Sequence, residues 1–312
     1  MAKLPIEVKN EMAKRHHRLA HYLWHSLRGI WERLDQNARN YIVSIYPGWE
    51  VPRPSNDRLG RPIRTNNSGE DFLFMHRQMI GLANSILQSV GNPEYPKVVG
   101  WKTLPLPNNA EFPIIPMKGM EEFKSEDFFN NRMRPWEIQY TSENYLSNVT
   151  LGEMGVDLEI TIHNMMHMRW ATPMPNDVGY RPDTAIDQPV NIKWNNIKYD
   201  YLGDTYSSHV HDTFWKIHGW VDDRINDWKR VNNIDEINWN GKWIGPMQHH
   251  SHQEMAILSQ PKILIDLEGI TESELTNDFD KMIEVSKVLS KFDNIGFISK
   301  EIPQEKKIDG VE

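Results

Sequence analysis

Apolar residues recur at helical spacing in four long segments of the chain. They predict helices over about residues 6–35, 70–90, 155–170 and 211–230, with Pro5 suited to the start of the first. The apolar stripe of the first helix consists of Leu19, Leu23, Leu27, Ile30 and Leu34. That of the second consists of Phe72, Ile80, Ala83 and Leu87.

Two proline-rich stretches separate these segments. Residues 95–119 and 171–194 carry no helical period, and we expect them to form long irregular loops over a core. One further helix is predicted near the C-terminus, with an apolar face of Leu275, Phe279, Met282, Val285, Leu289 and Phe292. The pattern therefore predicts a mainly α-helical protein without an internal repeat.

Composition excludes several kinds of protein. The 312 residues include no cysteine, which excludes disulfides, thiolate metal sites, iron–sulfur clusters and cysteine nucleophiles. A formal net charge of −8 without a long basic block gives no electrostatic reason to expect nucleic acid as a partner. The N-terminus is too charged for a secretory signal, and no apolar run approaches a membrane span. We therefore expect a cytoplasmic protein that binds neither nucleic acid nor a membrane.

The 13 histidines are clustered along the chain. His163 and His167 lie one turn apart, so their imidazoles project from one helix face. This is the apolar face of the third segment, and His76 and His218 lie on the apolar faces of the second and fourth. A single inward histidine is usually a hydrogen-bonded core residue. Four of them on three helices are costly to bury unless something, such as a metal ion, satisfies their ring nitrogens.

The residue types around these histidines restrict the metal. In "HNMMH", Asn164 stands where the zinc-protease motif H-E-x-x-H has its catalytic glutamate. A di-iron bundle would need Glu-x-x-His pairs and further inward glutamates. Ligand sets of imidazole alone suit copper or zinc, and two neighbouring histidine sites in a helical core favour a pair of copper ions.

The order of the motifs resembles a known family. "HNMMH", followed by "DTFWKIHGWVDDRI", resembles the second copper site of the type 3 copper proteins, which include tyrosinases, catechol oxidases and hemocyanins. The resemblance implies that His163, His167 and His218 bind the second copper ion. Thr213 replaces the usual proline of the family pattern. The other flanks of the pattern are matched by Asp212, Phe214 and Asp222.

The first copper site is matched in part. "FLFMHR" resembles the F-L-x-x-H-R segment of the family, which makes His76 a ligand of the first ion. Many tyrosinases take another ligand from the loop before it, but Asn67 stands at that place. Hemocyanins and arthropod phenoloxidases use an H-x-x-x-H pair, and "HRLAHYLWH" supplies this spacing twice. The resemblance favours His21 and His25, with His17 as the alternative.

A solvated basic face is a second alternative for His21 and His25, because Arg18 and Arg28 lie on the same side of the helix. In that case the protein would hold one copper ion or take a ligand from the cluster at residues 249–252, which otherwise predicts a surface loop. His209 and His211 lie just before the fourth helix, and neither is expected to bind a metal.

The resemblance also implies residues that handle the substrate. Tyrosinases are thought to deprotonate a phenol through a water molecule held by an asparagine and a glutamate. Asn164 matches that asparagine, and the expected glutamate is Glu153, with Glu159 in reserve. Both carboxylates could equally be ordinary helix-surface residues. Met168 matches a position that lines the entrance of the site, where an apolar side chain favours a flat aromatic ring.

The function implied is that of a copper-dependent oxidoreductase. With two copper ions and O2 it would hydroxylate a small phenol, or oxidise a catechol or o-aminophenol to a quinone-type product. The alternative is a hemocyanin-like protein that binds O2 or copper without turnover, although hemocyanins carry shielding domains for which 312 residues leave little room. The substrate and a homo-oligomeric state stay open.

The resemblance covers about residues 17–230. We therefore expect a tyrosinase-like dicopper domain over residues 1–265, with a four-helix-bundle core and long proline-rich loops. Residues 266–312 would form the C-terminal helix and a mobile tail, packed on or beside this domain.

Overall fold

A computed structural model describes residues 3–45, 52–172, 195–240 and 272–290, and in the last range it describes only the side chains of residues 279–289. These residues are mainly α-helical and contain no β-strand, only an isolated bridge between Asn56 and Pro62. None of their helices is long and apolar enough to cross a membrane. The α-helices are α1 (Ile6–Met12), α2 (Arg15–Ile30), α3 (Gln36–Ile45), α4 (Ser68–Val90), α5 (Glu121–Lys124), α6 (Glu126–Phe128), α7 (Arg134–Thr141), α8 (Glu143–Leu146), α9 (Leu151–Leu158), α10 (Asn164–Trp170), α11 (Asp212–Val231) and α13 (Glu272–Ser290). Shorter helical turns are the 3-10 helices η1 (Trp31–Arg33) and η5 (Ser208–Val210) and the π-helices η2 (Phe129–Met133) and η3 (Glu159–His163).

The first predicted helix is two helices. Lys14 has an extended backbone (φ −60°, ψ 137°), which separates α1 from α2. α2 ends at Ile30, and η1 follows it before Leu34 turns the chain away. The prediction of one helix over residues 6–35 was wrong. The helical spacing of apolar residues continues across the bend at Lys14, so the sequence pattern does not reveal the bend. The predicted apolar stripe itself is buried.

The third predicted helix is interrupted by the π-helical turn η3, between α9 and α10. The carbonyl of Asp157, just before this turn, accepts hydrogen bonds from the hydroxyls of Thr161 (2.5 Å) and Tyr140 (3.3 Å). Such side-chain bonds offer a helix carbonyl a partner outside the α-helical ladder. A π-turn adds a residue to the helix, so the constant rotation of 100° per residue assumed for residues 155–170 was wrong. The second and fourth predicted helices agree with α4 and α11 to within two residues.

α4 is packed very closely against α9. A Cβ atom at Gly155 would lie 2.1 Å from the carbonyl oxygen of Gly69, and one at Gly69 would lie 2.1 Å from the backbone nitrogen of Val156. Only residues without a side chain permit this approach. The contact sets the distance between α4, which carries His76, and the turn that carries His163.

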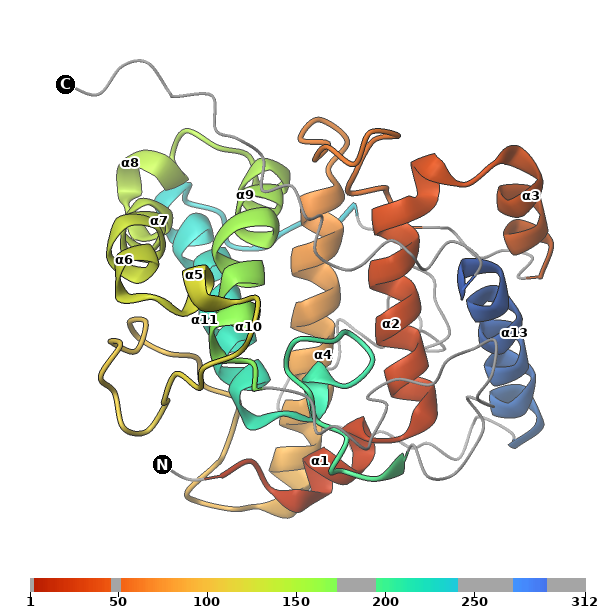
Figure 1. The fold of residues 1–312 in the computed structure, drawn as a ribbon, viewed down its shortest axis with the longest axis horizontal. Coiled ribbons are helices and arrows are strands. Elements are labelled where there is room, and N and C mark those ends of the chain that lie inside the picture. Colours follow the sequence, from red (N-terminus) through yellow and green to blue (C-terminus); the bar gives the residue numbers. More distant parts are fainter. Residues whose placement is uncertain (1–2, 46–51, 173–194, 241–271, 291–312) are drawn as a thin grey trace.

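Two ion pairs connect the elements that surround this contact, one between α4 and α11 and the other between α2 and η3. On α4, the guanidinium of Arg77 donates to Asp222 of α11 (Nε–Oδ1 2.6 Å). On α2, the buried Arg28 forms a bidentate pair with Glu159 of η3 and donates to the carbonyl of Ser68 (2.6 Å). α2 and α4 thus lie side by side, with α11 packed on α4 and α13 packed on α2 and α3 (Figure 1).

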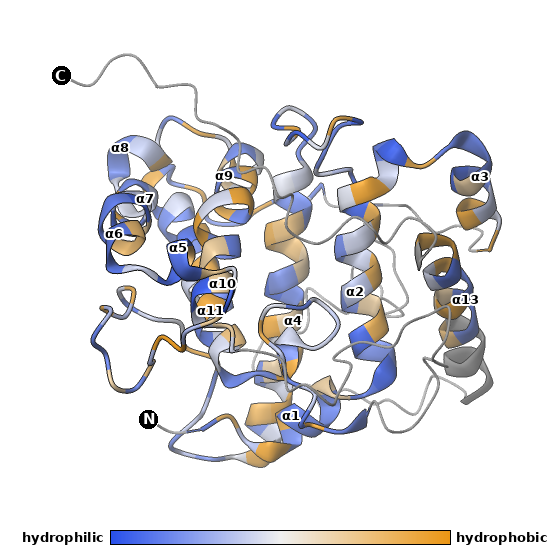
Figure 2. Ribbon diagram, in the orientation of Figure 1, coloured by the Kyte–Doolittle hydropathy of each residue, from blue (hydrophilic) through white to orange (hydrophobic). Residues whose placement is uncertain are grey.

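α2 is buried on its polar side as well as its apolar side. Figure 2 shows that it mixes hydrophilic and hydrophobic segments, and Arg18 and Arg28 are nevertheless at most 1% exposed. Arg18 donates to the carbonyls of Ala13 (2.9 Å) and Asn196 (3.0 Å). The alternative of a solvated basic face on this helix is therefore wrong.

The loop predicted at residues 95–119 is confirmed, since it contains no helix and buries Tyr95, Val98, Trp101 and Leu104. α13 agrees with the predicted C-terminal helix, and its Met282, Val285 and Leu289 are buried. The boundary predicted at residue 265, most of the second proline-rich stretch, the histidines of residues 249–252 and the C-terminal tail lie outside the described residues.

Candidate metal centre

The structure brings the six predicted ligand histidines into one buried cluster. Five elements around a common interior supply them, and none of the six is more than 9% exposed. They are His21 and His25 of α2, His76 of α4, His163 of η3, His167 of α10 and His218 of α11. Two groups of three have ring nitrogens within 4.8 Å of one another: His21, His25 and His76, and His76, His163 and His218.

His167 lies beside the second group rather than inside it. Its ring centroid is 4.7 Å from that of His163 and 5.2 Å from that of His218. The rings of His76 and His218 stack at 4.3 Å, so the two groups form one continuous cluster. The assignment of His76 to the first ion, and of His163, His167 and His218 to the second, stays a prediction.

The ring orientations are held through Nδ1. Four Nδ1 atoms lie within hydrogen-bond distance of a backbone carbonyl oxygen, which can only accept. Nδ1 therefore carries the proton and donates, and Nε2 keeps its lone pair, as in a histidine that binds a metal through Nε2. The four bonds are His21–Thr205 (2.5 Å), His76–Phe72 (2.9 Å), His167–Leu202 (2.8 Å) and His218–Phe214 (2.8 Å).

Four of the Nε2 atoms, those of His163, His218, His21 and His76, have no hydrogen-bond donor among the described residues. The Nε2 atoms of His163 and His218 are 3.0 Å apart. The Nδ1 of His218 donates to a backbone carbonyl, and that of His163 donates to the side-chain oxygen of Asn164 (3.1 Å). In the neutral rings neither Nε2 then carries a proton, so two lone pairs face each other. The Nε2 atoms of His21 and His76 are buried and have no hydrogen-bond partner among the described residues. A buried unsatisfied nitrogen costs about 1–3 kcal/mol. A metal cation would remove this cost, so these residues fit a metal site.

Burial keeps the imidazoles neutral. It lowers the pKa of His21 and of His167 to about 4. It also holds the pKa of the other cluster histidines well below the usual value, and neighbouring histidines lower it further. At neutral pH the cluster therefore presents lone pairs rather than positive charges, as metal binding requires.

Aromatic rings enclose the cluster. The ring of Phe214 stacks on that of His218 at 3.7 Å, and the ring of Phe72 lies 4.6 Å from His76 and 4.8 Å from His163. Two motif residues therefore form the apolar wall that separates the ring nitrogens from water. Two further motif residues connect α4 to α11. Arg77, which follows His76 on α4, forms an ion pair with Asp222, which lies one turn after His218 on α11.

The predicted carboxylates have structural partners. Glu153 completes the capping box of α9, accepting from the backbone N–H and the hydroxyl of Thr150 (both 2.9 Å), and these bonds lower its pKa. Glu159 is paired with Arg28. The role of Glu153 as a water-holding group stays a prediction.

The other two residues predicted to act on the substrate, Asn164 and Met168, adjoin cluster histidines in the chain. Asn164 lies next to His163 in sequence and in contact with its ring, as described above. Met168 directly follows His167 and is 6% exposed. Their roles toward a substrate also stay predictions.

Another buried histidine beside the cluster, His209, is a finding that the sequence did not indicate. The ring of His209, in η5, lies 4.8 Å from that of His21. Its Nε2 is 3.0 Å from the carbonyl oxygen of Met12, whereas its buried Nδ1 has no partner among the described residues. A position just before a helix carries no signal of burial. His211 instead caps α11, its Nδ1 accepting from the N–H of Thr213 (3.0 Å).

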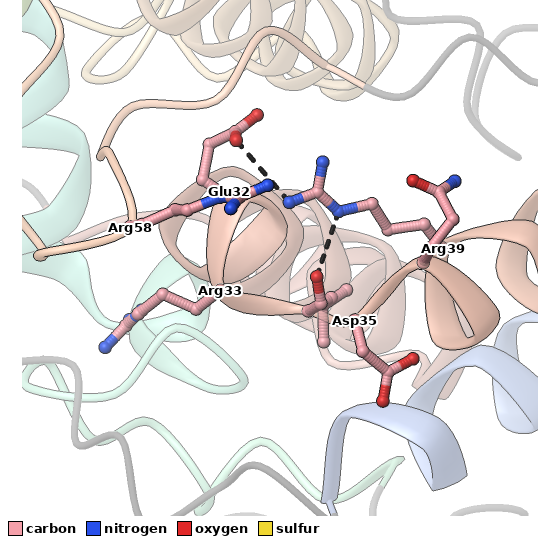
Figure 3. Close-up of a pocket in the computed structure, with 7 residues that line it drawn as sticks. Glu32, Arg33, Asp35, Arg39 and Arg58 are labelled. Atoms are coloured by element: carbon pink, nitrogen blue, oxygen red, sulfur yellow. Dashed lines mark hydrogen bonds and ion pairs between the residues drawn. The ribbon is translucent and has the colours of Figure 1, made fainter.

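Two surface pockets of the described residues lie away from the cluster. One, of about 460 Å³, lies beyond the C-terminal end of α2, and there Arg39 donates to Glu32 (3.4 Å; Figure 3). The other, of about 540 Å³, is lined by residues that include Lys124 and Arg169. No cluster histidine lines either pocket.

Comparison of the chain with models of known protein families finds no match, and comparison with curated protein sequences finds none either. The resemblance to type 3 copper proteins therefore depends on the sequence motifs, and the structure adds a buried histidine cluster that could hold metal ions.

Proposed function

We propose that this protein is a copper-dependent oxidoreductase of the type 3 copper kind, with two copper ions in a core formed by α2, α4, α10 and α11. The observation that carries the proposal is the pair of overlapping buried histidine groups. In His21, His76 and His218 the Nδ1 atom donates to a backbone carbonyl, which leaves the Nε2 lone pair for a metal. Imidazole ligands alone favour copper or zinc, and the motif order favours a copper pair.

The chain has two tasks in this reaction. When bound, the copper pair would supply O2 activation and accept electrons from a phenol, a catechol or an o-aminophenol. The carbonyl acceptors hold the imidazoles in place, so that little reorganisation is needed. Phe72 and Phe214 exclude water on their side of the cluster. Asn164 orients His163 and is the candidate to hold a water molecule near the substrate.

Copper loading tests the proposal. After gel filtration we expect two retained copper ions per chain, a near-ultraviolet absorption band typical of type 3 copper proteins after treatment with hydrogen peroxide, and oxidation of catechol or phenol in air. Retention of zinc in preference to copper, without such a band, would contradict the proposal. A band without turnover would instead favour the hemocyanin-like alternative.

Substitution of the helix α2 histidines tests the ligand assignment. In His25→Ala we expect loss of one retained copper ion and of the near-ultraviolet band, because a buried ligand of the first group is removed. The matched control is His17→Ala, two turns earlier on the same helix, which should keep the near-ultraviolet band of the buried centre. Loss of that band in His17→Ala, with the band kept in His25→Ala, would show that the assigned pair is displaced by one helical turn.

A further inference from the structure

Three potential ligands meet at the junction of α1 and α2. A carboxylate oxygen of Glu11 and ring nitrogens of His16 and His17 lie within 4.8 Å of one another. Side chains of successive helix residues point about 100° apart. The two rings are nevertheless only 4.1 Å apart, in the first turn of α2 directly after the bend at Lys14. Glu11 reaches them from the last turn of α1.

This group is accessible on one side and buried on the other. The side chains of Glu11 and Lys14 are 30% and 50% exposed, whereas that of His17 is 10% exposed. One oxygen of Glu11 lies 2.9 Å from Nε2 of His17, and the other lies 2.6 Å from the ammonium of Lys14. A divalent ion would take the place of the proton that Nε2 of His17 donates to Glu11. The exposed Lys14 can turn into solvent. Two imidazoles and a carboxylate form a common ligand set for divalent zinc and its neighbours.

The group is also connected to the buried centre. His17, His21 and His25 follow one another at intervals of one helical turn on α2, which places their Cβ atoms about 5–6 Å apart. Beside them, the ring of His209 lies 4.8 Å from that of His21, and its buried Nδ1 has no hydrogen-bond partner in the described part of the chain. A row of imidazoles therefore leads from the protein surface to the histidine cluster.

We propose that Glu11, His16 and His17 form a further binding site for a divalent transition ion, and that this site loads the buried centre. The ion passes from His17 to His21, with the Nδ1 of His209 as a ligand on the way. The loading step depends on the proposed function, because it requires that the buried centre takes up copper. The binding of an ion at Glu11 does not depend on it.

Equilibrium dialysis of the metal-free full chain against Zn2+ tests the binding site. We expect the double variant Glu11→Gln, His17→Ala to bind one ion fewer per chain than the wild type. Glu7→Gln, an exposed carboxylate on the same helix α1, is the matched control and should bind as the wild type does. Circular dichroism confirms the helical fold of each variant. The result is the difference in bound ions between the wild type and the double variant, so it does not depend on how many ions the buried centre binds. Equal binding by all three proteins would overturn the site.

The loading step is tested by the quenching of tryptophan fluorescence after mixing with one equivalent of Cu2+, since the ring of Trp24 lies 4.8 Å from that of His25. The double variant should load roughly tenfold more slowly, which corresponds to about 1.4 kcal/mol in the barrier, and reach the same number of retained ions. His209→Asn, which keeps a donor for the carbonyl of Met12, should also load more slowly while retaining the site at Glu11. Unchanged rates in both would overturn the loading role. A wild-type protein that retains no copper would instead contradict the proposed function and leave the dialysis result standing.

Discussion

At the scale of single residues, hydrogen bonds already assign a structural task to several candidate catalytic side chains. The oxygen of Asn164 accepts one hydrogen bond from the ring of His163, which leaves its second lone pair and its NH2 group to hold a water molecule. The carboxylate of Glu153 caps α9 with one oxygen, Oε2. A comparison of two substrates distinguishes a role of these residues in the reaction from their structural roles.

We expect Asn164→Ala and Glu153→Gln to slow phenol hydroxylation by roughly 10²-fold and catechol oxidation much less. A simple phenol has a pKa near 10 and depends on a held water molecule as base, whereas a catechol is more acidic. The measurement is kcat/KM on a matched phenol and catechol, at equal copper content.

Equal slowing of both substrates in Asn164→Ala would restrict this residue to orienting His163. Because glutamine also completes a capping box, unchanged rates in Glu153→Gln would restrict Glu153 to capping α9.

At the scale of elements, the close approach of α4 and α9 sets the geometry of the centre. In Gly155→Ala the added Cβ would lie 2.1 Å from a backbone carbonyl, so the two helices must separate. We expect a loss of roughly 1–3 kcal/mol in the free energy of unfolding, measured in urea, and weaker copper retention as His76 and His163 move apart.

The matched control for this contact is Gly81→Ala, on the exposed side of α4, where nothing lies within 4 Å of an added Cβ. It should be neutral or stabilise the protein by about 0.5–1 kcal/mol, because alanine is the better helix former. A destabilisation equal to that of Gly155→Ala would show that α4 does not tolerate alanine for reasons other than the contact with α9.

At the scale of the whole molecule, the buried histidines make the metal-free protein sensitive to acid. His21 and His167 have a folded-state pKa of about 4, below the value of about 6.5 in an unfolded chain. Between these values the unfolded state binds more protons, so stability is fully present above pH 6.5 and is lost as the pH falls toward 4. Each such histidine removes up to roughly 1.4 kcal/mol per pH unit over this window.

Urea unfolding of the metal-free protein at pH values from 7 to 4 measures this loss. Copper-loaded protein is the comparison, and its loss should begin at lower pH because a bound ion competes with the proton. A stability of the metal-free protein that stays constant from pH 6.5 to 4 would contradict the neutral, buried state of these imidazoles.

The sequence by itself determined the parts that depend on local spacing. The apolar period located α4 and α11 and the apolar stripe of α2, because a helix repeats its faces at short range. The one-turn spacing of His21 and His25, and of His163 and His167, placed each pair on one face for the same reason. The motifs around His76 and His218 then identified which histidines to expect together.

Only the tertiary structure decided the parts that depend on contacts between distant segments. Arg28 is buried because Glu159 meets it, and His209 is buried because η5 packs beside α2. The bend at Lys14 and the π-turn before Asn164 change the backbone direction without changing the apolar pattern. The sequence pattern shows which side of a helix is apolar, but not which other helix covers that side. The covering helix decides whether a charged or imidazole side chain is buried, paired or free to bind a metal.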